Sequence, residues 1–70
     1  MLVEQEQDLR KLGEDWYMSI FQQRDQWQVV LAKDEIDGPM VLGVANNPKR
    51  AFKTAFNYAK EYEDNLKKSS

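Results

Sequence analysis

Two groups of charged residues are the first places in this sequence to look for chemistry. Asp34, Glu35 and Asp37 stand close together along the chain, and neighbouring carboxylates can act as general acid and base or bind a divalent cation. A calcium loop, however, needs oxygen ligands at alternate positions and a later glutamate, and this spacing does not fit. We therefore expect acids of a solvated turn, with no metal and no cofactor.

The residue types that the chain lacks also argue against catalysis. There is no cysteine and no histidine, which removes disulfides, the usual zinc ligands and every mechanism that depends on either residue. Serine and threonine are limited to Ser19, Thr54, Ser69 and Ser70. A chain of 70 residues rarely encloses a catalytic pocket. The sequence therefore predicts a binding protein and not an enzyme.

The second charged group is basic and consists of Lys49, Arg50 and Lys53. These residues fall in the first turns of a predicted helix, where the helix dipole disfavours cations. A phosphate or an acidic partner bound there would offset that cost and use the free amides of the first turn. The alternative is that the three cations only solubilise the outer face of the helix.

Hydrophobic spacing locates the helices that must position these groups. Apolar residues at intervals of three and four predict a helix over 48–66, with a capping side chain from Asn46-Asn47 and with Pro48 in its first turn. Its apolar face is Phe52, Ala55, Phe56, Ala59, Tyr62 and Leu66. A weaker pattern of Leu2, Leu9 and Leu12 predicts a short helix or partly ordered arm over 1–13.

Three apolar stretches lie between the predicted helices. Residues 15–22, 27–33 and 40–45 are rich in aromatic and branched side chains and are joined by short polar links, which favours an antiparallel meander of three strands. The expected fold is therefore α+β, a single domain over 1–70. In it, a long C-terminal helix packs on a three-stranded antiparallel sheet, and a short N-terminal helix completes the domain.

The alternation of side chains along these strands predicts two apolar sheet faces. The face beneath the long helix is expected to carry Trp16, Met18, Ile20, Trp27, Val29, Leu31, Met40, Leu42 and Val44. The opposite face is expected to carry Tyr17, Ser19, Phe21, Gln28, Val30, Ala32, Val41, Gly43 and Ala45. Because this second face is not polar, either the N-terminal helix or another molecule must cover it. We predict a partner or dimer face at Tyr17, Phe21 and Val30; alternatively, these aromatic rings pack beside helix ends.

The charge is unevenly distributed along the chain. Nine acids and four bases precede Gly38, and three acids and six bases follow it, so the two parts carry −5 and +3 and sum to −2. The acids at the predicted strand ends can form one negative rim, which we call the acidic rim: Glu14, Asp15, Asp34, Glu35 and Asp37. Such a rim predicts a basic, nucleic-acid-binding protein as partner. In this the chain is similar in kind to phage-type inhibitors that mimic DNA.

The sequence also suggests where the protein acts. The longest apolar stretch, 40–45, is far too short to span a membrane. Residues 1–12 are acidic and glutamine-rich, unlike the basic and apolar regions of a secretory signal. We therefore expect a cytoplasmic protein without a membrane partner.

The order helix–strand–strand–strand–helix resembles that of double-stranded-RNA-binding domains. In that family the last helix begins with a lysine-rich segment of the form Lys-Lys-x-Ala-Lys. The segment Lys49-Arg50-Ala51-Phe52-Lys53 is similar, and it follows Val41-Leu42-Gly43 on the last predicted strand. The resemblance implies that Lys49, Arg50 and Lys53 contact phosphates across a groove. A double-stranded nucleic acid is thus the alternative partner.

Overall fold

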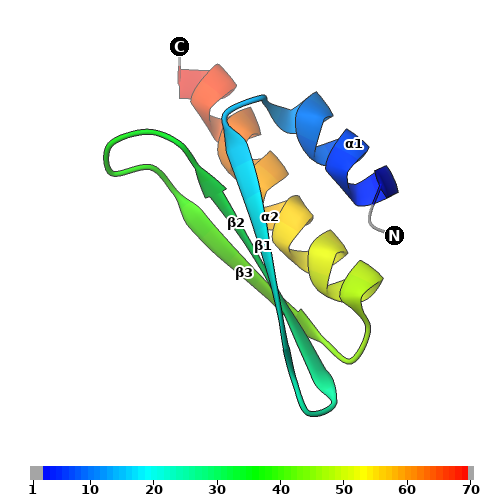
Figure 1. Cartoon of the computed structure of the whole chain (residues 1–70). Helices are drawn as coiled ribbons and strands as arrows, with labels where there is room; N and C mark the ends of the chain where they lie inside the picture. The colour runs from blue at the N-terminus through cyan, green and yellow to red at the C-terminus, as the bar shows by residue number, and fades with distance from the viewer. Residues whose placement is uncertain (1–2, 70) are drawn as a thin grey trace.

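Two helices pack on one face of a three-stranded sheet in the computed structural model, which describes residues 3–69 (Figure 1). The elements follow in the order α1 (Val3–Leu12), β1 (Trp16–Gln23), β2 (Gln26–Lys33), β3 (Met40–Ala45) and α2 (Pro48–Ser69). The predicted α+β fold is confirmed, and α2 is longer than expected. Leu2, which was expected on the first helix, lies outside the described residues. Within residues 3–69, neither helix combines the length and apolarity needed to cross a bilayer.

The strands form an antiparallel meander in the order β1-β2-β3, so β2 is central and the other two strands are edges. Arg24 and Asp25 form the two-residue turn between β1 and β2, because Gln23 pairs with Gln26. Arg24 has a φ of 51°, in the left-handed region that usually requires glycine at the first central position of such a turn.

The core lies between the sheet and α2. Its fully buried large side chains are Leu9 of α1, Trp16 of β1, and Val29 and Leu31 of β2. The helix contributes Phe52 and a row of alanines at intervals of four: Ala51, Ala55 and Ala59. The expected apolar face of α2 is thus largely confirmed, although Leu66 near the end of the helix is 42% exposed.

The predicted faces of β1 and β2 are confirmed, but the prediction for β3 was wrong by one residue. Val29 is opposite Gly43, and Leu31 is opposite Val41. Since paired residues point to the same side of a sheet, Val41, Gly43 and Ala45 face α2, whereas Met40, Leu42 and Val44 face away. The reason is a close approach of the helix, because a Cβ at Gly43 would collide with the Ala51 carbonyl oxygen.

The N-terminal helix lies beside α2 and does not cover the second sheet face. It contacts α2 and β1, and its buried Leu9 belongs to the same core as Trp16. Figure 1 shows α1 next to α2, on the same side of the sheet. Of the two covers considered for the second face, the N-terminal helix is therefore excluded.

Candidate functional site

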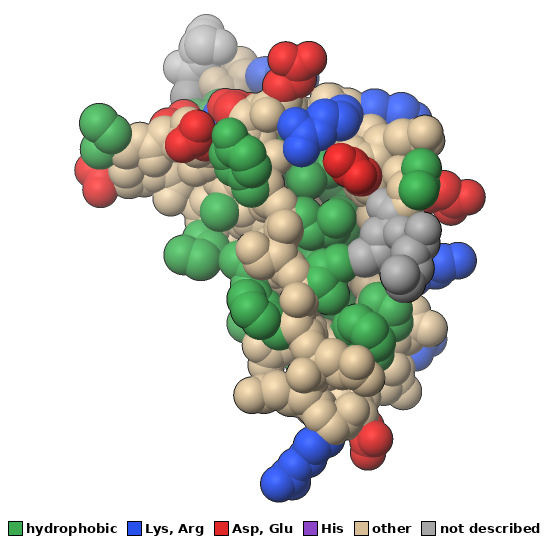
Figure 2. Space-filling view, viewed as in Figure 1, with side chains coloured by type: hydrophobic (Ala, Val, Ile, Leu, Met, Phe, Trp, Pro, Cys, Tyr) green, Lys and Arg blue, Asp and Glu red, His purple; other side chains and the backbone are tan. Residues whose placement is uncertain are grey.

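The sheet face turned away from α2 carries five of the nine exposed large hydrophobic side chains found among the described residues, and we call it the open face. Its residues form three rows across β1, β2 and β3: Tyr17, Ala32 and Met40; Ser19, Val30 and Leu42; Phe21, Gln28 and Val44. Figure 2 shows hydrophobic side chains gathered over the strands.

Five large hydrophobic side chains of the open face are exposed to solvent. Tyr17 and Phe21 are each 54% exposed, Met40 is 72%, Leu42 is 50% and Val44 is 42% exposed. Contiguous exposed apolar surface of this kind marks an interaction site more often than a scatter of single residues does. The one-residue correction in β3 makes this face more hydrophobic than the sequence predicted, because three large side chains replace Val41, Gly43 and Ala45.

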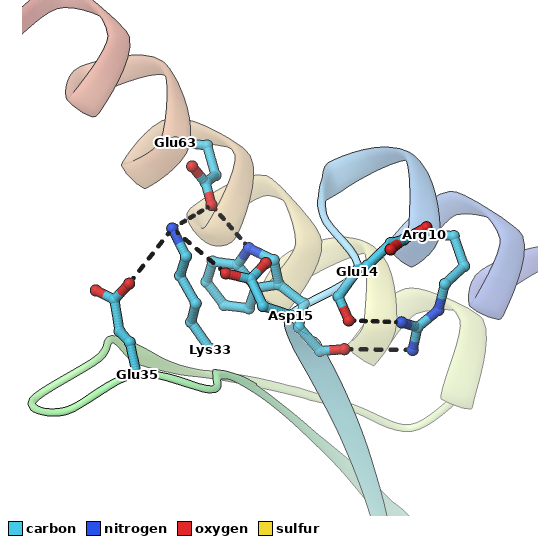
Figure 3. A network of polar contacts seen from close by, with 7 residues as sticks. Arg10, Glu14, Asp15, Lys33, Glu35 and Glu63 are labelled. Carbon is cyan, nitrogen blue, oxygen red and sulfur yellow. Dashed lines mark hydrogen bonds and ion pairs between the residues drawn. The ribbon is translucent and has the colours of Figure 1, made fainter. Parts of the chain in front are cut away.

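One end of the sheet carries a cluster of charges around Lys33, the last residue of β2 (Figure 3). Its ammonium lies 3.0 Å from Glu63 Oε1, 3.8 Å from Glu35 Oε2 and 4.0 Å from Asp15 Oδ2. The ring of Tyr62 lies 5.9 Å from the same nitrogen. The Lys33 side chain is only 12% exposed, so its charge needs these partners.

The same oxygen of Glu63 also accepts a hydrogen bond from Trp16 Nε1 at 2.8 Å. This bond and the nearby ammonium hold the pKa of Glu63 below its ordinary value of 4.5, despite the opposing effect of burial. The hydrogen bond to Glu63 in turn raises the pKa of Lys33 above 10.5. Both groups are therefore charged at neutral pH.

The structure brings most of the acidic rim to this end of the sheet. The Asp34 amide donates to the Asp15 carbonyl oxygen at 2.7 Å, which joins the loop after β2 to the start of β1. Tyr17 donates its hydroxyl to Asp34 at 3.4 Å, so the rim borders the open face. Asp37 lies farther along the loop, with a φ of 58°.

The rim is nevertheless not uniformly negative. Asp15 and Glu35 share Lys33, as described above, and Figure 3 shows both carboxylates turned toward its ammonium. Glu14 accepts a hydrogen bond from Arg10 at its backbone oxygen, at 2.9 Å. All five rim residues are exposed. The rim therefore presents carboxylates to solvent around a central cation.

The basic group at the start of α2 lies at the other end of the sheet, because α2 follows directly after the end of β3. Lys49, Arg50 and Lys53 are all exposed. The Asn47 side-chain oxygen accepts from the amides of Lys49 at 2.9 Å and Arg50 at 3.3 Å, and the Ala51 amide donates to the Asn47 carbonyl oxygen. The amides expected to bind a phosphate are therefore already used.

Sequence reasoning missed the charge cluster and three members of the open face. The sequence did contain one indication of the charge cluster. Lys33 follows Val29 and Leu31 at alternate positions of β2 and so points to the same inward side, where a charge needs a partner. Its partner Glu63 lies 30 positions away on another element, and no local pattern connects the two. Met40, Leu42 and Val44 were assigned to the wrong face because β3 is apolar on both sides.

No protein-family model matches the chain, and neither a curated protein nor a solved structure matches it.

Proposed function

We propose that this chain is a non-catalytic, cytoplasmic protein that acts by binding another protein through its open face. One observation carries the proposal: five large hydrophobic side chains of that face are between 42% and 72% exposed, and no element of residues 3–69 covers them. Aromatic and methionine side chains are enriched at protein interfaces. Covering this surface would add hydrophobic stabilisation to a chain whose small size limits its own core.

The charges around the open face indicate the chemistry of the partner. The Tyr17–Met40 row adjoins the acidic rim, through the bond between the Tyr17 hydroxyl and Asp34. A complementary partner has an apolar patch bordered by lysine or arginine at one end. A basic, nucleic-acid-binding protein has such residues. In the narrower form of the proposal, the rim occupies the partner's phosphate-binding surface and inhibits it, as a DNA mimic does.

A photo-crosslinking residue at position 21 in the source cell tests the open face directly. The expected product joins this chain to a basic protein, and binding to that purified protein is lost in Phe21→Lys. Asn57, which is exposed on the outer side of α2, supplies both the control crosslinking position and the control variant Asn57→Lys. Retained binding in Phe21→Lys, or equal crosslinking from position 57, contradicts the proposal.

Changes of salt concentration and of rim charge distinguish the contribution of the acidic rim to binding from that of the open face. If the rim contacts basic groups, association weakens as salt increases, and Asp34→Asn with Asp37→Asn weakens it further. If only the open face contributes, neither the increase in salt nor the two substitutions alters the affinity. An affinity independent of salt would therefore remove the mimicry while leaving the face as the binding site.

Double-stranded nucleic acid is the second candidate ligand, favoured by the exposure of Lys49, Arg50 and Lys53 on the first turns of α2. The similarity to double-stranded-RNA-binding domains suggests the same three residues. Labelled duplex RNA and DNA at low salt test this candidate. A shift that is lost when all three residues are changed to glutamate would support it, and the absence of a shift with wild type would reject it.

A further inference from the structure

The two edges of the sheet differ in how they are protected. At the β1 edge, the α1 side chain of Arg10 donates to the Trp16 carbonyl oxygen at 3.3 Å, and α1 contacts the strand. The β3 edge has no such cover among residues 3–69. Between Met40 and Ala45 there is also no charge and no proline, the residues with which proteins usually block an edge. The edge of β3 is therefore available for pairing.

The register shows which backbone groups this edge presents. Lys33 donates its amide to the Pro39 carbonyl oxygen, and these residues continue the register in which Leu31 is opposite Val41. Because bonded pairs alternate along an antiparallel ladder, Val41, Gly43 and Ala45 direct their backbone groups toward β2. The amides and carbonyls of Met40, Leu42 and Val44 therefore point away from the sheet.

We propose that β3 pairs antiparallel with β3 of a second copy of this chain, with the two-fold axis at Leu42. In this register Leu42 is opposite Leu42, and Met40 is opposite Val44 in both directions. Each outward amide then meets an outward carbonyl, and the two sheets become one sheet of six strands. This proposal concerns the edge and does not depend on what binds the open face.

Side chains on the open face agree with this register. Paired residues point to the same side of the sheet, so the new contacts are leucine with leucine and methionine with valine. All three are exposed in the single chain and gain burial from the pairing. A shift by two residues would leave one end of β3 opposite the loop at Asn46 and lose a pair. The segment 40–44 is thus apolar and self-complementary about its central residue.

The position of α2 provides room for the second copy. This helix packs on both β2 and β3 and is contacted by α1. Phe56, Lys60 and Glu63 line a hollow between α2 and α1, so α1 lies on that flank of α2. If the axis of α2 lies between β2 and β3, strands about 4.8 Å apart place the two helices about 10 Å apart across the two-fold axis. Helices in contact are separated by about 8–10 Å. Strand pairing and helix packing are therefore compatible.

Charges on α2 are complementary in this arrangement. Gly43 lies against Ala51 and Ala55, which places Leu42 near residue 55 of the helix. On the flank away from α1, helical spacing puts Arg50 and Glu61 at nearly equal distances on either side of this level. The antiparallel helices then bring Arg50 of each copy to Glu61 of the other. Tyr58, which is 55% exposed, lies on the same flank and would pack against Thr54 of the second copy.

This complementarity favours a second copy over an extended peptide from another protein. A peptide would use only the backbone of β3, whereas a second copy also uses the flank of α2. The pairing of Arg50 with Glu61 occurs twice by symmetry, and it follows from the same axis that aligns Leu42. The strand register and the helix charges are therefore consistent with one two-fold arrangement.

Sedimentation and amide exchange of the intact chain test the proposal. We expect a mass that reaches twice the 8.3 kDa of one chain as the concentration increases. Exchange at Met40, Leu42 and Val44 should slow over the same range, because their amides face solvent in the single chain and are bonded in the dimer. A monomer at every soluble concentration, or a dimer in which these amides exchange freely, overturns the proposal.

Two variants at Leu42 distinguish the contribution of its backbone amide to dimerisation from that of its side chain. Leu42→Pro removes the outward amide without removing a bond to β2, which an edge strand tolerates, and we expect loss of the dimer. Leu42→Ala keeps the amide and should retain the dimer. If Leu42→Pro remains dimeric and Phe21→Lys is monomeric, the copies associate through the open face and the edge proposal is wrong.

Exchanging the charges of Arg50 and Glu61 tests the proposed contact between the two α2 helices. Both residues are exposed, so the substitutions carry little risk to folding. Arg50→Glu and Glu61→Arg should each raise the dimer Kd about tenfold, because two symmetry-related pairs become repulsive. The double variant should restore the wild-type Kd. Additive weakening in the double variant contradicts the proposed arrangement, as would single variants with unchanged Kd.

Discussion

Trp16 and Glu63 are 47 positions apart in the sequence, yet the indole N–H of the first donates to a carboxylate oxygen of the second at 2.8 Å. The same oxygen lies 3.0 Å from the Lys33 ammonium. One atom of α2 therefore satisfies the polar group of the largest fully buried side chain and neutralises a charge at the end of β2. These bonds attach the C-terminal half of α2 to the sheet.

We expect Glu63→Ala to lower the free energy of unfolding by about 1–3 kcal/mol at neutral pH, because it leaves a buried indole N–H and a largely buried ammonium without their acceptor. Glu63→Gln should cost less, since its amide oxygen can still accept from Trp16. Urea unfolding followed by circular dichroism measures both. Asp64→Asn, at an exposed position of the same helix, is the control and should change stability by less than about 0.5 kcal/mol. Equal stability of Glu63→Ala and wild type would contradict this.

The Glu63 carboxylate also makes the free energy of unfolding depend on pH. The pKa of Glu63 is lowered in the folded state from 4.5, so the unfolded chain binds a proton more readily. The stabilisation is fully present above the unfolded value and is lost as pH falls through the folded pKa. Comparing wild type with Glu63→Gln across this range isolates the effect, and the acid-induced loss should be smaller in the variant. Parallel pH profiles would show that Glu63 is not the titrating group.

The contact between β3 and α2 predicts that Gly43→Ala is strongly destabilising. The new methyl group would collide with the Ala51 carbonyl oxygen and lie 2.7 Å from the Ala55 amide nitrogen, and the helix backbone would have to move away. Overpacking of this kind costs about 1–3 kcal/mol, measurable as a lower urea midpoint. Ser19→Ala, a comparable small change on the open face, should leave the midpoint within experimental error. An unchanged midpoint for Gly43→Ala would mean that the helix does not approach β3 this closely.

The turn between β1 and β2 offers a stabilising substitution. Arg24 has a φ of 51°, a conformation that costs a residue with a side chain about 1–2 kcal/mol. Arg24→Gly removes this cost. Glycine also makes the unfolded chain more flexible, which lowers the free energy of unfolding by about 0.5–1 kcal/mol. We therefore expect a small net gain in thermal stability. Asp25→Gly is the matched control, because the φ of Asp25 is not positive, and it should lower the Tm. Loss of stability in both variants would contradict the turn geometry.

The exposed rings of the open face should contribute little to the stability of the single chain. Phe21 is 54% exposed, and we expect Phe21→Thr to change the free energy of unfolding by less than about 0.5 kcal/mol. Val29→Thr, at a fully buried position of β2, should cost about 1–3 kcal/mol because it buries an unpaired hydroxyl. Similar losses in the two variants would indicate that Phe21 belongs to the core.

The fold could be predicted because each element has a local pattern. The intervals of three and four in α2, its Asn47 cap, and the alternation in β1 and β2 are all properties of neighbouring residues. The face of β3 could not be predicted in this way, since Met40–Ala45 is apolar at both odd and even positions. Its orientation is determined by the fit of Gly43 to the alanines of α2, a contact between two elements.

The candidate site was predicted in part for the same reason. Tyr17, Phe21 and Val30 lie on the face where alternation placed them. The acids of the loops also gather at one end of the sheet, because their strands begin and end there. That Lys33 lies among them depends on packing between β2 and α2, which no single segment of the sequence encodes.

The unequal burial of the two tryptophans gives the protein an internal optical label. Trp16 is completely enclosed and bonded to a carboxylate, whereas Trp27 at the start of β2 is only half-buried. Replacing Trp27 with phenylalanine would leave one indole whose emission wavelength reports whether α2 is seated on the sheet. Detachment of α2 would thus shift the emission wavelength even while the strands stay paired.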